Sequence, residues 1–217
     1  MSRLVCVFPV DDSTNFLESV RMVLEEKLGA TIIRGDTTRE EHRNEISNRL
    51  HELTEQDIFV FMGHGASYCL YGSPQGGELQ PLFGKGALSL PNRSRSLLIS
   101  CRSNDFTESL QLINAIGFGE IPATWEEMRK LREEDCSCYA GVDEDTIPEY
   151  QNSLVQALCG ALRLWNPSSP LRQLYQNIRL CITGQIVRLH LDQTLAQEQK
   201  QGLFEMLYDL KQGVDIY

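Results

Sequence analysis

The sequence has no apolar run long enough to cross a membrane and no amino-terminal segment with the pattern of a secretion signal. Basic residues are scarce: 20 Lys and Arg stand against 30 Asp and Glu, and a net charge of −10 disfavours direct contact with nucleic acid. The seven cysteines follow no regular spacing, which is typical of free thiols in a reducing compartment. We therefore expect a cytoplasmic protein whose partners include neither a membrane nor a nucleic acid.

Motifs of common cofactor and metal sites are also missing. The chain contains no phosphate-binding G-x-x-x-x-G-K-[ST], no dinucleotide-binding G-x-G-x-x-G after a strand and no H-E-x-x-H. A Rossmann-like small-molecule binder would need such a phosphate loop. Cys136 and Cys138 lie close together, but a tetrahedral zinc site needs a second Cys or His pair beside them. We expect no cofactor and no metal ion.

Three apolar segments, at residues 4–8, 31–33 and 58–62, alternate with segments whose apolar residues recur at helical spacing. Strands that are apolar throughout are buried on both faces, as in a parallel sheet covered by helices. The alternation of strand and helix is typical of such a sheet. The pattern predicts one α/β domain over residues 1–217, with a mostly parallel sheet and helices on both faces.

The rest of the chain is less regular, and residues 166–217 are expected to form a mainly helical extension of the same domain. Three pairs have the spacing of helix capping boxes: Asn15 with Glu18, Thr38 with Glu41, and Thr146 with Glu149. The acidic stretch at 126–149 is interpreted as a solvated face or as part of a site. Other expected elements are a loop at 66–96, a short helix at 106–113, a strand at 116–123, helices at 146–165, 171–181 and 204–210, and an outer strand at 187–191.

Two of the apolar runs end abruptly in small residues and one reactive side chain. The run at 59–62 leads to Gly63, His64 and Gly65, and the run at 97–99 leads to Ser100 and Cys101. Since sites in open parallel sheets lie at the carboxyl ends of the strands, a His and a Cys that leave two strands can face each other. Such a pair suits nucleophilic catalysis by a thiolate. The alternative is that Cys101 is a small core residue and His64 marks a turn.

An apolar strand ending in His-Gly, followed by one ending in a small residue and Cys, resembles the caspase-like cysteine peptidases, which include caspases, metacaspases, separases and bacterial CHAT-domain proteases. The run from Ser100 to Ser103 resembles the caspase signature around the nucleophile, with Ser in place of Ala and Gly. The resemblance covers about residues 1 to 165. It implies that Cys101 attacks a peptide carbonyl, that His64 is the acid and base, and that the N–H groups of Gly65 and Cys101 stabilise the oxyanion.

The same resemblance implies a protein or peptide substrate and regulation by loop cleavage or by a protein partner. Caspases hold an aspartate substrate with arginines, whereas the corresponding places here carry Asp11, Asp12 and Glu126. We therefore expect cleavage after Arg or Lys, with Trp125 as the aromatic residue of the substrate groove. The alternative is that the two aspartates begin a turn and cap the first helix, that Trp125 covers the sheet and that Glu126 is solvated.

A second functional hypothesis is a protein-binding module with a caspase-like scaffold, in which the Cys and His pair is catalytically inert. The retention of both His64 and Cys101 in matching positions favours the enzyme. The other three histidines, His42, His51 and His190, are expected to be surface residues because their neighbours are polar. The sequence therefore predicts a cysteine endopeptidase with a Cys-His dyad.

Overall fold

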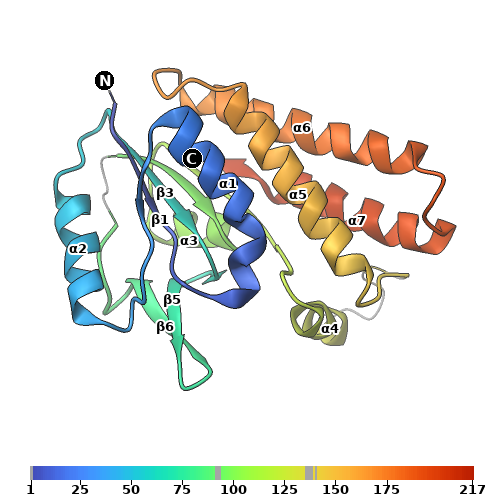
Figure 1. Ribbon diagram of the computed structural model, residues 1–217, viewed down its shortest axis with the longest axis horizontal. Coiled ribbons are helices and arrows are strands. Elements are labelled where there is room, and N and C mark those ends of the chain that lie inside the picture. Colours follow the sequence, from blue (N-terminus) through green and yellow to red (C-terminus); the bar gives the residue numbers. More distant parts are fainter. Residues whose placement is uncertain (1, 91–93, 135–138, 140) are drawn as a thin grey trace.

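Six strands form the central sheet of the computed structural model, which describes residues 2–90, 94–134, 139 and 141–217 (Figure 1). Their order is β2-β1-β3-β7-β8-β9, in which the first five run parallel and β9 is antiparallel to β8. Strands β1 and β3 are buried at every position, as their unbroken apolar sequences predict. The strands are β1 (Leu4–Val7), β2 (Thr31–Ile33), β3 (Ile58–Met62), β7 (Arg95–Ile99), β8 (Ala115–Gly117) and β9 (Asp215–Ile216).

Helices cover both faces of this sheet, which confirms the predicted α/β arrangement. Successive strand residues point to opposite faces, so that Met62 and Ile99 belong to one core and Phe61 and Leu98 to the other. The first core lies under a 3₁₀ turn η1 (Asp12–Leu17), α1 (Glu18–Met22), a π-helical turn η2 (Val23–Lys27), α5 (Thr146–Arg163), α6 (Leu171–Leu191) and α7 (Gln197–Gly213). The second lies under α2 (Glu40–His51) and α3 (Ser103–Ser109).

The described part of residues 66–96 is not the long loop that its glycines and prolines predict. Strands β5 (Cys69–Gln75) and β6 (Glu78–Gly84) form an antiparallel hairpin, and β4 (Gly65–Ala66) pairs with β5. The hairpin turns at Gly76 and Gly77, whose φ angles of 63° and 86° favour glycine. Phe83 of β6 meets Phe59 of β3 edge to face, with ring centroids 5.6 Å apart. This aromatic packing fixes the hairpin to the face of the sheet that α2 covers.

The outer strand expected at residues 187–191 is also wrong, because α6 continues without a break to Leu191. Alternation over five residues was a short signal, and Val187 and Leu191 are exposed on the helix surface. The short helix at 106–113 lies instead at Ser103–Ser109, and the strand at 116–123 is limited to β8. The helix predicted at 171–181 is the first half of α6, and the helix predicted at 204–210 lies within the longer α7.

None of the three predicted capping boxes forms. Asp11 caps the first helical segment through the N–H of Ser13, and the hydroxyl groups of Thr38 and Thr146 bond to aspartates two and three residues before them. Short polar side chains can satisfy these local bonds as readily as a helix terminus, which explains the error. The acidic stretch begins as a helix, α4 (Trp125–Glu134), whose buried Met128 packs into the first core.

In the described part of the chain, no helix is both long and apolar enough to span a membrane. No cluster of three metal-ligating side chains occurs among the described residues. Cys136, Ser137 and Cys138 lie outside the described residues.

Candidate active site

His64 and Cys101 leave neighbouring parallel strands at the same level. Met62 at the end of β3 pairs with Ile99 at the end of β7, and each reactive residue follows two positions later. The two residues line one pocket, whose volume of ≈ 20 Å³ is room for about one water molecule. The structure therefore brings together the pair that the sequence predicts. The pocket is also lined by Thr14, Phe16, Leu17, Gly63, Ile99, Ser100, Ile121 and Ala123.

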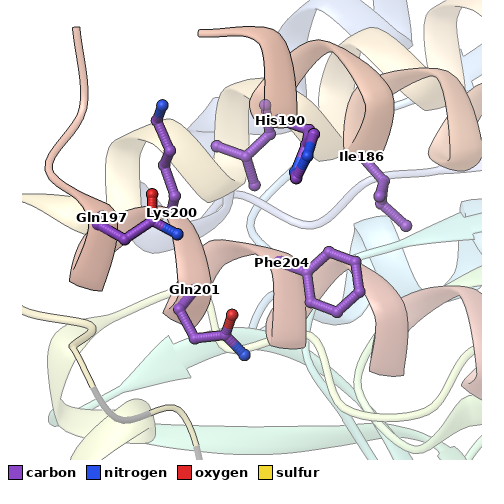
Figure 2. Close-up of a pocket in the computed structure, with 7 residues that line it drawn as sticks. Ile186, His190, Gln197, Lys200, Gln201 and Phe204 are labelled. Atoms are coloured by element: carbon purple, nitrogen blue, oxygen red, sulfur yellow. The ribbon is translucent and has the colours of Figure 1, made fainter. Parts of the chain in front are cut away.

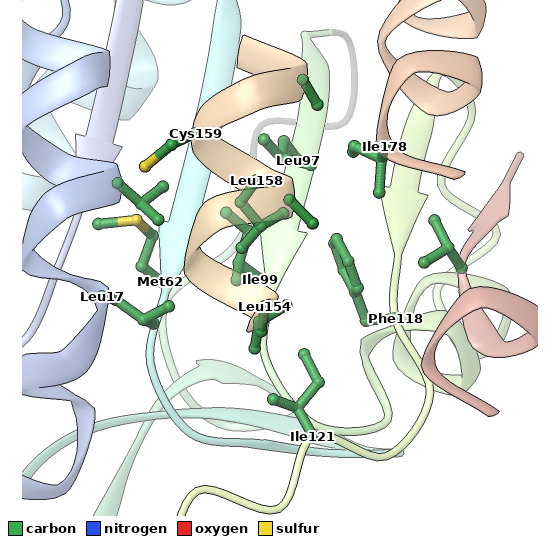
Figure 3. Packing of buried hydrophobic residues seen from close by; sticks show 14 of the residues in the cluster. Leu17, Met62, Leu97, Ile99, Phe118, Ile121, Leu154, Leu158, Cys159 and Ile178 are labelled. Carbon is green, nitrogen blue, oxygen red and sulfur yellow. The ribbon is translucent and has the colours of Figure 1, made fainter. Parts of the chain in front are cut away.

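Three residues that line this pocket, Leu17, Ile99 and Ile121, belong to the main core, which is drawn in Figure 3. Met62 and Ile99 precede the reactive residues on their strands, and Leu154 of α5 lies against the same cluster. All three side chains are buried, with at most 1% of their surface exposed. Dense packing of this kind leaves little freedom for the strand ends, so the core fixes the positions of His64 and Cys101.

Cys101 lies on a tight turn between β7 and α3. The next residue, Arg102, has φ 51° and ψ 26°, a left-handed conformation that non-glycine residues seldom adopt. The turn is held by the N–H of Arg102, which donates to the Gly119 carbonyl at 2.8 Å, and by the Ser103 hydroxyl, which donates to the Leu98 carbonyl at 2.7 Å. Backbone strain of this kind collects at functional sites. Within the described residues, the amide of Cys101 has no hydrogen-bond acceptor, which leaves it available to an oxyanion.

The thiol of Cys101 is in its protonated form. Its Sγ donates to the carbonyl of Ile121 at 2.9 Å and accepts from the N–H of the same residue at 3.0 Å. Burial raises the pKa of this thiol far above its usual range, and the nearby carboxylates of Glu120 and Glu127 raise it further. Because the thiolate is the reactive form, Cys101 needs a base to take its proton.

One ring nitrogen of His64 is held by Ser13 and Asp11, which follow β1. Nε2 lies 2.6 Å from the Ser13 hydroxyl, which lies 2.6 Å from Asp11 Oδ1, and Nε2 is 3.5 Å from Asp11 Oδ2. An ionised carboxylate only accepts hydrogen bonds, so the single hydroxyl proton of Ser13 points to Asp11 and Nε2–H must donate to Ser13. Ser13 thus orients His64 and is not a nucleophile that His64 could deprotonate.

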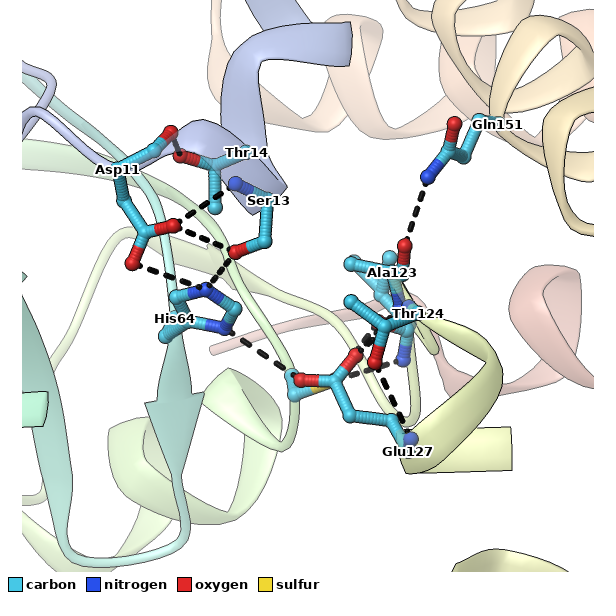
Figure 4. A network of polar contacts seen from close by, with 10 residues as sticks. Asp11, Ser13, Thr14, His64, Ala123, Thr124, Glu127 and Gln151 are labelled. Carbon is cyan, nitrogen blue, oxygen red and sulfur yellow. Dashed lines mark hydrogen bonds and ion pairs between the residues drawn. The ribbon is translucent and has the colours of Figure 1, made fainter. Parts of the chain in front are cut away.

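The other ring nitrogen, Nδ1, faces Glu127 of α4 at 3.5 Å from Oε1 (Figure 4). The second oxygen, Oε2, accepts the N–H groups of Ala123 and Thr124 at 2.7 and 3.1 Å. Burial lowers the pKa of His64, but Glu127 and Asp11 outweigh it and the net shift is upward. Burial likewise opposes ionisation of Glu127, yet His64 and the two amides hold its pKa below the usual range. His64 therefore lies between two carboxylates that favour its protonated form.

Sequence reasoning missed Glu127, although a signal was present. The Thr124 hydroxyl accepts the N–H of Glu127 at 3.2 Å while the Glu127 carboxylate accepts the N–H of Thr124. This is the capping box T-x-x-E at the start of α4. The box turns Glu127 back toward the strand ends, while Glu126 is exposed on another side of the helix. The motif from Thr124 to Glu127 is the sequence signal for this position.

The four residues expected to bind substrate have different positions. Asp11 reaches His64, as described above, and is occupied by Ser13. Asp12 is exposed, and its carboxylate accepts a hydrogen bond from Asn15 at 3.3 Å. Trp125 begins α4, partly buried, with the Arg132 guanidinium 5.3 Å from its ring centre. Only Asp11 is brought to the predicted pair, and the substrate contacts of Asp12, Trp125 and Glu126 stay predictions.

Gly65 lies so close to the turn at Ser100 and Cys101 that no larger residue fits there. A Cβ at this position would lie 2.6 Å from the Cys101 carbonyl oxygen and 2.6 Å from Ser100 Oγ. We expect Gly65→Ala to push β4 away from the turn, lowering stability by about 1–3 kcal/mol. Any peptide cleavage should fall by about a hundredfold, because a displacement of about 1 Å misplaces the reacting groups. Thermal unfolding and turnover check both effects.

The matched control is Gly184→Ala on α6, where nothing lies within 4 Å of the added methyl group. This variant should be as stable as the parent or slightly more stable, since alanine favours a helix over glycine. A Gly65→Ala protein with parental stability would show that β4 can adapt to the added methyl group.

A wider pocket lies elsewhere, between α6 and α7, with a volume of ≈ 330 Å³ (Figure 2). Its walls are mainly the apolar parts of Ile186, Leu189 and Phe204, with His190 and Lys200 at its side. His190 is exposed, as predicted from its polar neighbours, and no cysteine lines this pocket. Although this pocket is the wider of the two, it lacks the cysteine that the expected nucleophilic chemistry needs.

Family models, curated proteins and solved structures were each compared with this chain, and none gave a match. The chemistry of the pocket is therefore inferred from its residues and their geometry alone.

Proposed function

We propose that this protein is a cysteine endopeptidase of the caspase-like kind, in which Cys101 is the nucleophile and His64 is the acid and base. The observation that carries this proposal is the register of two strands: Met62 pairs with Ile99, so that His64 and Cys101 leave β3 and β7 side by side and line one pocket. Reactive groups at the carboxyl ends of adjacent parallel strands are where sheets of this type build their sites.

The hydrogen-bond pattern supports a specific sequence of proton transfers. Because Nε2–H donates to Ser13, Nδ1 is the nitrogen that can act as the base. Once Nδ1 has released its own proton to solvent, it accepts the thiol proton as Sγ of Cys101 bonds to the peptide carbonyl carbon, and that proton then goes to the leaving amine. Water hydrolyses the resulting thioester and releases the acid. The Cys101 amide, together with that of Gly65, would stabilise the negative oxygen formed in each step.

The charges around the pocket favour a basic substrate. Asp11 and Glu127 flank His64, and the carboxylate of Glu120 acts on Cys101. A guanidinium or ammonium group would form charge-assisted hydrogen bonds here, whereas a substrate aspartate would meet like charges. No cofactor enters this chemistry.

We expect cleavage after Arg or Lys to exceed cleavage after Asp by about 2 kcal/mol or more, roughly thirtyfold in kcat/KM. Matched fluorogenic peptides with Arg, Lys, Ala or Asp before the scissile bond measure both activity and preference. Equal cleavage after Asp would contradict the acidic pocket. An Arg preference that survives in Asp12→Asn and Glu126→Gln would assign recognition to the carboxylates nearer His64.

The narrow pocket also bears on regulation. A volume of ≈ 20 Å³ leaves little room beside Cys101, and we infer that opening of the strand-end loops would widen the pocket for a substrate. Binding of a protein partner or cleavage of a loop would supply that opening, as in the peptidases that the sequence resembles. We therefore propose that activity is under regulatory control.

The alternative function is an inert protein-binding module, and one observation favours it. Burial and nearby carboxylates raise the pKa of the Cys101 thiol, and its sulfur is hydrogen-bonded to the backbone of Ile121, which disfavours the reactive thiolate. The peptide panel separates the two functions, because an inert module cleaves no member of it under any condition that opens the loops.

A further inference from the structure

Glu127 stands where it controls both members of the proposed dyad. Its Oε1 faces Nδ1 of His64 at 3.5 Å, and its charge raises the pKa of the Cys101 thiol. The other ring nitrogen is already bound to Ser13, so Nδ1 is the one nitrogen of His64 that can serve Cys101. In the proposed dyad, the thiol would have to use the same ring nitrogen that the carboxylate faces.

The carboxylate is held in this place by its own hydrogen bonds. Oε2 accepts two backbone N–H groups, those of Ala123 and Thr124, and Met128 in the next position of α4 is fully buried. The Ala123 carbonyl accepts the side-chain amide of Gln151 on α5 at 2.7 Å, which ties this turn to the core (Figure 4). These hydrogen bonds and the buried Met128 fix the position of the Glu127 carboxylate.

We propose that Glu127 is an electrostatic brake: a positioning residue that keeps a proton on Nδ1 of His64 and on Sγ of Cys101, and so holds the dyad in its unreactive form. This inference rests on the proposed function, because a brake presupposes a dyad. In this proposal Glu127 lowers the reactivity of the dyad, whereas an orienting acid would raise it. Asp11 and Ser13 fix the ring, and Glu127 restrains the base.

The sign of the effect follows from the charges that face each group. His64 faces Asp11 from the segment after β1 and Glu127 from α4, while Cys101 faces Glu120 and Glu127. Removing one negative charge makes the imidazolium a stronger acid and the thiol a stronger acid. Both changes extend the reactive form of the dyad to lower pH, whereas loss of an orienting acid would slow the reaction.

The test is Glu127→Gln, because glutamine keeps the capping box of α4 and removes only the charge. Glu133→Gln on the exposed side of the same helix is the matched control. Two quantities are measured across pH: the alkylation rate of Cys101 by iodoacetamide, followed by mass spectrometry of its peptide, and the titration of the His64 imidazole by NMR. Neither requires peptide cleavage.

In Glu127→Gln we expect Cys101 to be alkylated about tenfold faster at neutral pH, since each pKa unit changes the thiolate fraction about tenfold. The His64 titration should move to lower pH, and Glu133→Gln should match the parent in both. A folded Glu127→Gln protein with parental alkylation and titration would overturn the brake. Slower alkylation would also overturn it and make Glu127 an activating group.

Peptide cleavage by the parent is scored separately and bears only on the proposed function. If the parent cleaves peptides, the acidic limb of its kcat/KM profile should move to lower pH in Glu127→Gln, which supports the brake. A limb that stays in place while the variant is folded contradicts it.

Discussion

Cys101→Ser is expected to lower peptide cleavage at least about a thousandfold while leaving the thermal transition nearly unchanged. The hydroxyl group is a far weaker nucleophile than a thiolate, so the first bond to the carbonyl carbon no longer forms at a useful rate. It can still donate to the carbonyl and accept from the N–H of Ile121, as the sulfur does. Turnover on the basic peptides and thermal unfolding measure the two quantities.

Cys101→Ala should lose the same activity but also some stability. Without the sulfur, the buried N–H of Ile121 has no acceptor, and an unpaired buried donor costs about 1–3 kcal/mol. The comparison of the two variants separates chemistry from structure. Cys181→Ser on α6 is the control, because this partly buried thiol lies away from the pocket. Parental turnover in Cys101→Ser would exclude Cys101 as the nucleophile.

His64→Gln should lower cleavage by about a hundredfold to ten-thousandfold, the usual contribution of a general acid and base. The amide has roughly the size of the ring and can bond to Ser13 or Glu127, but it cannot take up the thiol proton. Turnover measured across pH should lose the acidic limb that belongs to His64. A variant whose pH profile retains that limb would show that another group supplies the proton.

The same variant changes how stability depends on pH. The pKa of His64 is raised in the folded state, so its charge stabilises the fold fully below the unfolded pKa of about 6.5. This contribution is lost as the pH rises through the higher folded pKa. The free energy of unfolding of the parent should therefore exceed that of His64→Gln most at pH 5–6, and the difference should shrink toward alkaline pH. A difference that grows with pH would contradict the ion pairs with Asp11 and Glu127.

The sequence predicted those parts of the site that depend on strand ends. Apolar runs that stop at His64 and Cys101 indicate two buried strands, and parallel pairing brings their ends to one edge. Glu127 could not be placed in the same way, because successive residues on a helix point about 100° apart. Choosing between Glu126 and Glu127 requires the phase of α4, which its capping box sets.

The fold beyond the sheet was predicted less well, for a related reason. The hairpin of β5 and β6 is rich in glycine and proline, residues that are depleted in strands, and its stability comes from tertiary contacts such as Phe83 on Phe59. The five residues at 187–191 fit a strand and a helix equally, and only the length of α6 decides between them.

The two outermost strands of the sheet bear on how the protein behaves when concentrated. β2 has three residues and β9 has two, so each edge presents few unpaired N–H and C=O groups to a second molecule. Long, flat edges recruit strands from other chains and begin fibrous aggregation, and short ones are a common protection against it. The inner strands β1 and β3 can therefore be apolar throughout, while the short edge strands limit pairing with other molecules.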